Sequence, residues 1–371
     1  MDQVYKYLKQ YIDELVFITL DNHVTQQKKD ISFLKGIPLP ISVKNITQQI
    51  SQEEVDNIPF DAFVEGMIYV LGVDYNFKYN EQYKKFLYLA NENIEEYILY
   101  KGLKFADEEK LYEAAVHFRA VFNMDERNLN AMYNYGKCCR DIFDRSKELE
   151  EKKTFKNESI NMFESLVGYY PDFNESYYFL GFFYSNQKMF EKARLTWEKF
   201  LSLSKDEEKR EEVVLKLKEI EDYVVYEKGY SLVLNGNGEK GLELLLPLED
   251  KYSQWWNLLF FIGLAYRNLN QFNEAIPYFK KVLLNKPSQV DAMNELGLCY
   301  MSVEDLDNAE KYYKKALLIK EDHEILCNLG VVYIYKEDYE KALDYLEKSA
   351  AICPEDEIVM QWLKKLNEIT R

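Results

Sequence analysis

Three histidines, His23, His117 and His323, are the residues of this sequence best suited to act as general bases or metal ligands. They fall in separate segments of the chain, so their spacing suggests neither a metal site nor a nucleophile with an adjacent base. The many carboxylates fit the solvated faces of helices, and no acid–base pair can be named among them. We predict that the protein is not an enzyme and holds no metal and no cofactor. An enzyme with its site in residues 21–60 is the least favoured alternative.

One segment matches the spacing of a dinucleotide-binding fingerprint, with Gly236, Gly238 and Gly241 at its three glycine positions. That fingerprint requires a preceding strand and a βαβ unit, whereas a helical pattern precedes the glycines here. We therefore interpret the segment as a turn between two helices, in which Asn and Gly provide positive φ angles.

The cysteines and the apolar runs indicate in which cellular compartment the protein is found. The five cysteines are odd in number, and each lies inside a helical pattern: Cys138, Cys139, Cys299, Cys327 and Cys353. Free thiols in a reducing compartment explain this arrangement best. The first residues lack a basic segment followed by an apolar one, and no apolar run approaches the roughly 20 residues of a membrane span. We expect a cytoplasmic protein.

The charge of the chain narrows the class of partner. The 371 residues include 47 Lys and Arg and 64 Asp and Glu, which gives a formal net charge of −17. Such a chain repels phosphate backbones and anionic lipid headgroups. We predict no nucleic-acid and no membrane partner, and we favour a protein or peptide that is neutral or basic.

A pattern of 33 to 34 residues occurs twice in residues 289–354. The fixed offsets hold Met293, Leu296, Gly297, Tyr300, Ala309, Tyr313 and Ala316 in the first copy, and Leu326, Leu329, Gly330, Tyr333, Ala342, Leu346 and Ser349 in the second. A period of this length indicates a repeat array. The pattern resembles the tetratricopeptide repeat, which has a large apolar residue, then Leu-Gly or Leu-Ala, Tyr, Ala, an aromatic residue and Ala.

Seven units can be placed from residue 95 onward. One glycine recurs at the same place in each: Gly102, Gly136, Gly181, Gly229, Gly263, Gly297 and Gly330. A small residue follows in the second half of each unit: Ala114, Ser159, Ala193, Gly241, Ala275, Ala309 and Ala342. A large residue lies four positions further on: Phe118, Phe163, Trp197, Leu245, Phe279, Tyr313 and Leu346. Small residues at both places would let two antiparallel helices of one unit cross closely.

Each helix of a unit carries an apolar stripe that one unit alone cannot cover, so the units must stack. We predict an all-α fold, a right-handed superhelical solenoid of antiparallel helix pairs like that of the tetratricopeptide repeat, with a helical N-terminal cap region. Residues 3–20 have the spacing of an amphipathic helix, residues 36–40 must be extended because of their prolines, and Ser51 with Glu54 suggests a capping box. Residues 60–72 and 80–93 read as two helices, either a degenerate repeat or a cap.

Two irregularities interrupt the repeat. The second unit has 11 extra residues around 143–153, which we expect to lengthen its first helix and its turn. The fourth unit is preceded by 14 extra residues without Gly or Pro, for which we predict one helix from Glu207 to Leu234. The expected domains are residues 1–94, repeats 1–3 in 95–207, a helical extension in 208–221, repeats 4–7 in 222–356, and a capping helix in 357–371.

The resemblance implies a binding surface, because the first helices of tetratricopeptide repeats line an inner, concave side. The residues at the inward offsets of the third to fifth repeats are largely apolar: Tyr178, Phe182, Tyr226, Tyr230, Phe260, Phe261 and Leu264. Polar inward residues flank them: Asn134, Lys137, Arg140, Arg267, Asn294 and Asn328. An exposed apolar band marks an interaction site, and the alternative is that neighbouring helices or the chain's own ends bury these rings.

Two functions follow from this interpretation. The first is an interaction scaffold whose inner groove binds a peptide or a partner helix through the aromatic residues. The second is a peptide-responsive signalling regulator in which the N-terminal helical region is the effector. A carboxylate clamp of the kind found in chaperone-binding relatives does not fit, because the places for its Lys, Asn and Arg hold Leu99, Leu103, Glu175 and Phe179 around Asn134.

Overall fold

The computed structural model describes residues 3–19, 29–42 and 60–370. The chain divides into two compact units, unit 1 (Met1–Val214) and unit 2 (Leu215–Arg371). The capping box expected at Ser51 and Glu54 lies outside the described residues.

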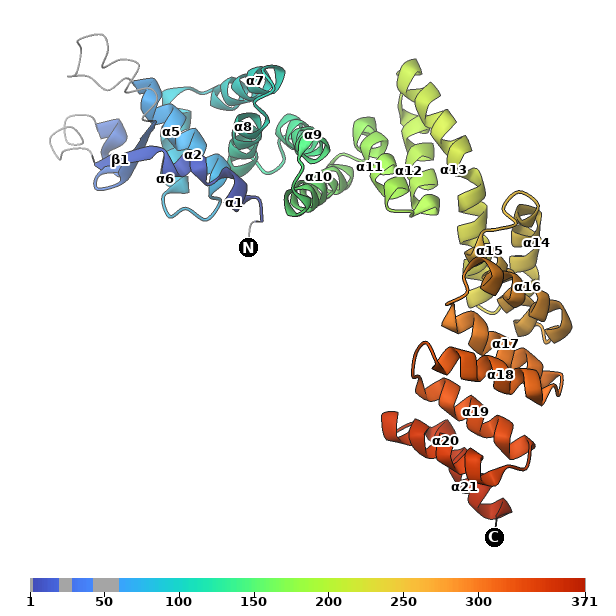
Figure 1. Cartoon of the computed structure of the whole chain (residues 1–371). Coiled ribbons are helices and arrows are strands. Elements are labelled where there is room, and N and C mark those ends of the chain that lie inside the picture. The colour runs from blue at the N-terminus through green and yellow to red at the C-terminus, as the bar shows by residue number, and fades with distance from the viewer. Residues whose placement is uncertain (1–2, 20–28, 43–59, 371) are drawn as a thin grey trace. The chain divides into compact units, whose positions relative to one another are not determined.

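Unit 1 begins with two short helices and two strands (Figure 1). They are α1 (Tyr5–Leu8), α2 (Gln10–Asp13), β1 (Leu15–Thr19), the 3-10 helix η1 (Lys29–Leu34) and β2 (Pro38–Ser42). The strands pair antiparallel, with Leu15 opposite Ser42 and Thr19 opposite Pro38. The extended backbone expected at 36–40 is confirmed from Pro38 onward, whereas the helix expected over 3–20 is wrong in its second half. Residues 15–19 (LVFIT) are rich in β-branched side chains, and the extended proline segment supplies their pairing partner.

The next two helices, α5 (Phe60–Val73) and α6 (Asn80–Ala90), confirm the helices expected in this region. A Cβ on Gly66 would lie 2.3 Å from the carbonyl oxygen of Pro40, and one on Gly72 would lie 2.0 Å from that of Val116. Helix α5 therefore lies directly against β2 on one side and the first repeat on the other. The Tyr83 hydroxyl of α6 donates a hydrogen bond to the Pro38 carbonyl, which ties the strand to the same layer.

Seven helix pairs follow. The pairs are α7 (Ile94–Asp107) with α8 (Leu111–Met124), α9 (Leu129–Arg145) with α10 (Leu149–Tyr169), α11 (Asn174–Asn186) with α12 (Phe190–Leu203), α13 (Glu207–Leu234) with α14 (Gly238–Glu249), α15 (Trp256–Asn268) with α16 (Phe272–Asn285), α17 (Val290–Ser302) with α18 (Leu306–Leu317), and α19 (His323–Tyr335) with α20 (Tyr339–Ile352). Helix α21 (Glu357–Ile369) follows the last pair and begins at the residue predicted for the capping helix. The two helices of each pair pack antiparallel (Figure 1), so the predicted all-α, tetratricopeptide-like solenoid is confirmed.

The seven recurring glycines share one environment. Each lies beneath the large residue of its own pair; a Cβ on Gly181 would lie 2.2 Å from Nε1 of Trp197, and one on Gly297 would lie 2.4 Å from Cε1 of Tyr313. The small residue of each pair is fully buried beside this contact, and the Ser159 hydroxyl donates a hydrogen bond of 2.7 Å to the Gly136 carbonyl. The missing side chain is thus what lets the two helices of a pair approach.

The turns inside the pairs repeat one conformation. A single residue with φ near +60° lies between the helices of five pairs: Glu109, Lys188, Asn270, Glu304 and Glu337. In the turn between α13 and α14 the residue with positive φ is Gly236, at φ +81°. The segment with dinucleotide-fingerprint spacing is therefore the interhelical turn that the sequence predicted.

Both insertions are helical. Helix α9 has 17 residues and α10 has 21, against 13 and 14 in α11 and α12, so the first insertion lengthens both helices of its pair. The expectation of a longer turn is wrong, because only residues 146–148 separate α9 from α10. The second insertion extends α13 to 28 residues, and its bounds, Glu207–Leu234, are those predicted.

Tyrosine pairs join the helices of unit 2. In three successive pairs a tyrosine of the first helix stacks on one of the second at 5.5 to 5.7 Å between ring centroids: Tyr266 on Tyr278, Tyr300 on Tyr312, and Tyr333 on Tyr345. Lysine ammonium groups lie over several of these rings, including Lys314 over Tyr333 at 5.6 Å. Six of the 31 tyrosines of this sequence thus pack between paired helices of unit 2.

The glycine contact gives a first prediction. Gly181→Ala should lower the free energy of unfolding by about 1 to 3 kcal/mol, because the added methyl group overlaps the buried Trp197 ring. Gly168→Ala, on α10 with no atom within 4 Å of the added Cβ, should instead raise it by about 0.5 to 1 kcal/mol. Urea unfolding of both variants tests the contact, and equal effects of the two substitutions would contradict it.

A buried histidine gives a second prediction. His117 is fully buried between Tyr69 and Phe105, and its Nδ1 donates to the Glu113 carbonyl at 2.8 Å. Burial lowers the pKa of His117 to about 4 from an ordinary 6.5. The unfolded chain therefore binds a proton that the folded chain does not between these two pH values.

The contribution of His117 to stability is fully present above pH 6.5 and is lost as the pH falls toward 4, by about 3 kcal/mol in all. We expect His117→Gln to lose this part of the pH dependence. Urea unfolding of wild type and variant at several pH values from 7 to 4.5 measures it. Parallel stability curves for the two proteins would refute the assignment.

Candidate functional site

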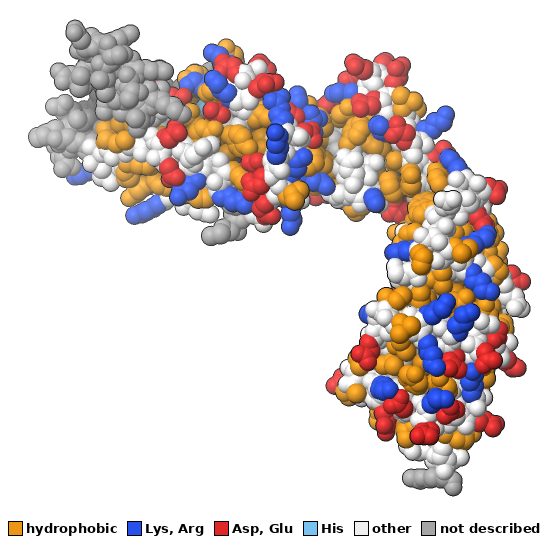
Figure 2. All heavy atoms as spheres, viewed as in Figure 1, with side chains coloured by type: hydrophobic (Ala, Val, Ile, Leu, Met, Phe, Trp, Pro, Cys, Tyr) orange, Lys and Arg blue, Asp and Glu red, His pale blue; other side chains and the backbone are white. Residues whose placement is uncertain are grey.

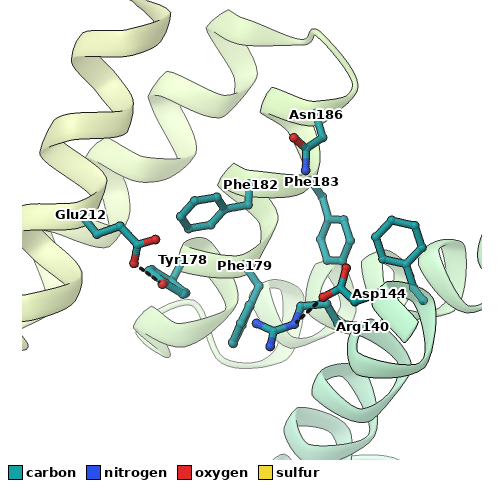
Figure 3. Close-up of a pocket in the computed structure, with 9 residues that line it drawn as sticks. Arg140, Asp144, Tyr178, Phe179, Phe182, Phe183, Asn186 and Glu212 are labelled. Carbon is teal, nitrogen blue, oxygen red and sulfur yellow. Dashed lines mark hydrogen bonds and ion pairs between the residues drawn. The ribbon is translucent and has the colours of Figure 1, made fainter. Parts of the chain in front are cut away.

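A pocket of about 250 Å³ lies in unit 1 between α9, α11 and the beginning of α13 (Figure 3). Five aromatic rings line it: Phe143, Tyr178, Phe179, Phe182 and Phe183. Its polar lining consists of Arg140, Asp144, Asn186 and Glu212. The sequence-predicted site residues Arg140, Tyr178 and Phe182 thus lie together in one cavity.

The aromatic wall is held rigid by ring packing. The Tyr178 ring meets those of Phe179 and Phe182 nearly at right angles, at 5.2 and 5.1 Å between centroids. Phe182 in turn packs edge-to-face on the buried Trp197, at 5.0 Å. Tyr178 and Phe182 are only half-buried, so the wall is preformed and still accessible.

The polar side of the pocket is ordered by ionic contacts. The Arg140 guanidinium lies 4.8 Å from the Phe179 ring centroid, donates to Asp141 Oδ1 at 2.8 Å, and lies 3.8 Å from Asp144 Oδ2. Opposite, the Tyr178 hydroxyl donates to Glu212 Oε2 at 2.6 Å. Burial and this hydrogen bond raise the pKa of Tyr178, so the hydroxyl stays protonated and keeps donating.

A second set of contacts fixes the start of α13 against α11. The Lys209 ammonium donates to both carboxylate oxygens of Glu175, at 2.7 and 2.8 Å, and lies 5.4 Å from the Tyr178 ring centroid. The Arg210 guanidinium donates to the Ser204 carbonyl at 2.9 Å. These contacts hold Glu212 beside Tyr178.

Three pocket residues come from the two insertions. Regular first helices end five residues after their glycine, whereas α9 continues beyond that point and carries Phe143 and Asp144. Glu212 lies in the part of α13 that precedes the regular repeat. Sequence reasoning missed these residues because the family offsets do not cover inserted segments. Asn186 could have been found, since it occupies one of the inward offsets of its repeat.

The other polar residues predicted on α9 lie outside this pocket lining. The Asn134 amide donates to the Asn130 carbonyl at 2.8 Å, within its own helix. Lys137 is exposed to solvent. Both lie on the same helix as Arg140, and their role in binding stays a prediction.

In unit 2 the predicted aromatic residues form a ring cluster. Tyr230 stacks on Phe261 at 5.0 Å, Tyr226 lies 4.3 Å from Trp255, and Phe260 lies 5.6 Å from Phe261. All of these rings are half-buried. Leu264 is a correction, because it is 8% exposed and belongs to the core of unit 2 rather than to an open surface.

The predicted polar residues of unit 2 contact each other or a neighbour. The Asn328 amide donates to Asn294 Oδ1 at 3.2 Å, across α17 and α19. Arg267 Nε lies 2.9 Å from Oε2 of Glu295, whose side chain is 15% exposed. Burial raises the pKa of Glu295, while Arg267 counteracts this effect. Arg267 is therefore the ion-pair partner of a largely buried carboxylate.

Comparison with known families identifies the repeats. A model of the tetratricopeptide repeat matches residues 288–355, and a second model of the same description matches residues 175–207 and 257–289. The chain is a tetratricopeptide-repeat protein. The comparison with curated proteins gives no match.

Several solved tetratricopeptide-repeat structures are similar to this chain. YrrB, described as a protein of this family with an unusual peptide-binding site, is 16% identical over 67% of this chain and 97% of its own, with a TM-score of 0.29. A tetratricopeptide repeat protein from Parabacteroides merdae is 13% identical over 73% of this chain and 98% of its own, with a TM-score of 0.36. A chain of the Cut9–Hcn1 hetero-tetramer of the APC/C is 15% identical over 97% of this chain and 72% of its own, with a TM-score of 0.41.

The described residues of this tetratricopeptide-repeat protein contain no cluster of three or more His, Cys, Asp and Glu that could hold a metal ion. Among the same residues, no helix combines the length and apolarity needed to cross a membrane. Lys and Arg are interspersed with Asp and Glu over the face drawn in Figure 2.

The Arg267 ion pair gives a third prediction. Arg267→Met should lower the free energy of unfolding by about 1 to 3 kcal/mol, because Glu295 is left largely buried without its cation. Adding Glu295→Gln should restore most of the loss. Arg194→Met is a matched control: its side chain is also 33% exposed, but its partner Glu191 is 36% exposed, so it should cost less than about 1 kcal/mol. A neutral effect of Arg267→Met in urea unfolding would contradict this structural role, and the predicted role of Arg267 in binding stays a prediction.

Proposed function

We propose that this tetratricopeptide-repeat protein is an interaction scaffold that binds a segment of a partner protein through the pocket between α9, α11 and α13. One observation carries the proposal. The two segments that depart from the repeat, the end of α9 and the start of α13, line the same pocket on either side of the regular helix α11.

The size of the pocket supports a protein segment rather than a small metabolite. Pockets for small molecules typically measure about 300 to 1,000 Å³, whereas this one measures about 250 Å³. It suits a single anchoring side chain whose backbone continues along the surface of the first helices. Recognition of an extended or helical segment by an aromatic anchor site is a recurring mode of peptide binding.

Preorganisation also supports this function. The rings of Tyr178, Phe179 and Phe182 hold one another, and Trp197 supports them from the neighbouring helix α12. A partner therefore does not have to order the pocket when it binds, which reduces the entropic cost of association. Aromatic residues arranged in this way are the usual energetic centres of protein interfaces.

Selection from a displayed library of random 12-residue peptides on the full chain tests the proposal. We expect enriched peptides whose affinity falls at least tenfold on Phe182→Ala, because the aromatic wall is lost. Asn186→Trp should have the same effect by filling the pocket from its rim without touching its packing. Leu195→Ala, on the exposed side of α12, is the control and should leave binding unchanged.

Thermal unfolding and circular dichroism of each variant exclude a folding defect as the cause. The proposal is wrong if the selected peptides bind the Phe182→Ala and Asn186→Trp proteins as tightly as wild type, or if no peptide is enriched on the wild type.

A further inference from the structure

We propose that the side chain this pocket accepts is an arginine of the partner, so that the scaffold recognises a basic segment. The inference rests on the proposed function and adds the chemistry of the occupant. It follows from three features of the pocket: its ring faces, its charge balance, and the position of one carboxylate.

The ring faces already attract cations of this chain. The Arg140 guanidinium lies over Phe179, and the Lys209 ammonium lies near Tyr178, at 4.8 and 5.4 Å from the ring centroids. Such contacts attract a cation to the face of the ring, and the attraction is stronger when water is excluded. The Phe182 ring, which packs on that of Tyr178, has no cation over it among the described residues.

The charge balance favours a further cation. Arg140 is bound by Asp141, and Lys209 is bound by both oxygens of Glu175. Two carboxylates of the lining have room for a further cation: Asp144, whose ion pair with Arg140 is long at 3.8 Å, and Glu212, which in the described part of the chain accepts only from the neutral Tyr178 hydroxyl. An anionic side chain would meet repulsion from both, whereas a cationic one would be attracted by both.

Glu212 is placed to receive a guanidinium. Its Oε2 accepts from the Tyr178 hydroxyl at 2.6 Å, which fixes the carboxylate at the edge of the ring (Figure 3). No cation forms an ion pair with Glu212 among the described residues. A planar guanidinium entering the pocket can stack on the Phe182 ring and donate to Glu212 at the same time. A lysine ammonium is more strongly hydrated and has no face for stacking, so it gains less.

The test uses peptides selected on the wild-type chain as defined above. We expect arginine to be enriched at one position, and replacement of that arginine by citrulline, its uncharged isostere, to weaken binding at least tenfold. Glu212→Gln should weaken the arginine peptide about threefold to tenfold and reduce the effect of citrulline. Glu211→Gln, which makes the same charge change on the same exposed helix, should change affinity by less than twofold.

The outcomes separate this inference from the function on which it rests. Peptides that depend on Phe182 but tolerate citrulline, or that carry lysine instead, overturn the arginine site and leave the scaffold function intact. Peptides that do not depend on Phe182 overturn both. Equal effects of Glu212→Gln and Glu211→Gln would mean that the preference for arginine arises from the overall negative charge of the chain. This result would also overturn the arginine site.

Discussion

The close approach of two helices at a residue without a side chain is the constraint on which this structure depends. In each pair a glycine lies under a large residue of the second helix, as Gly181 lies under Trp197. This contact buries the large residue, sets the distance between the helices, and presents the remaining apolar stripe to the next pair. Because every pair is built in this way, first-helix residues outside the glycine contact and the apolar stripe are not needed for packing.

The pocket illustrates what that freedom allows. A regular array presents similar first helices in succession, and its surface changes only through side chains. Here two helical insertions extend α9 and α13 beyond the repeat and bring Asp144 and Glu212 to the two sides of Tyr178. The insertions therefore add walls to a surface that the repeat alone leaves open, while the glycine contacts beneath remain unchanged.

The sequence predicted features that depend on local offsets and missed those that depend on distant partners. The helix pairs, the turn at Gly236 and the bounds of α13 all follow from residues close in the chain. Residues 15–19 became a strand because 38–42 are extended beside them, which no local pattern reveals. Likewise, the repeat offset places Leu264 on the inner face, but its contacts with the core of unit 2 bury it. The ion pair of Arg267 with Glu295 also joins residues from two different helices, which no offset predicts. Inserted residues such as Glu212 have no counterpart in the regular repeat, so no repeat offset predicts where they lie.

The insertions and α11 together form the surface that we propose a partner contacts. Hydrogen–deuterium exchange of the full chain, with and without a peptide selected on it, measures where a partner binds. We expect slower exchange on binding at the end of α9, in α11 and at the start of α13, with no change in the second helices of the pairs. Protection confined to unit 2 or to the N-terminal strands would contradict it.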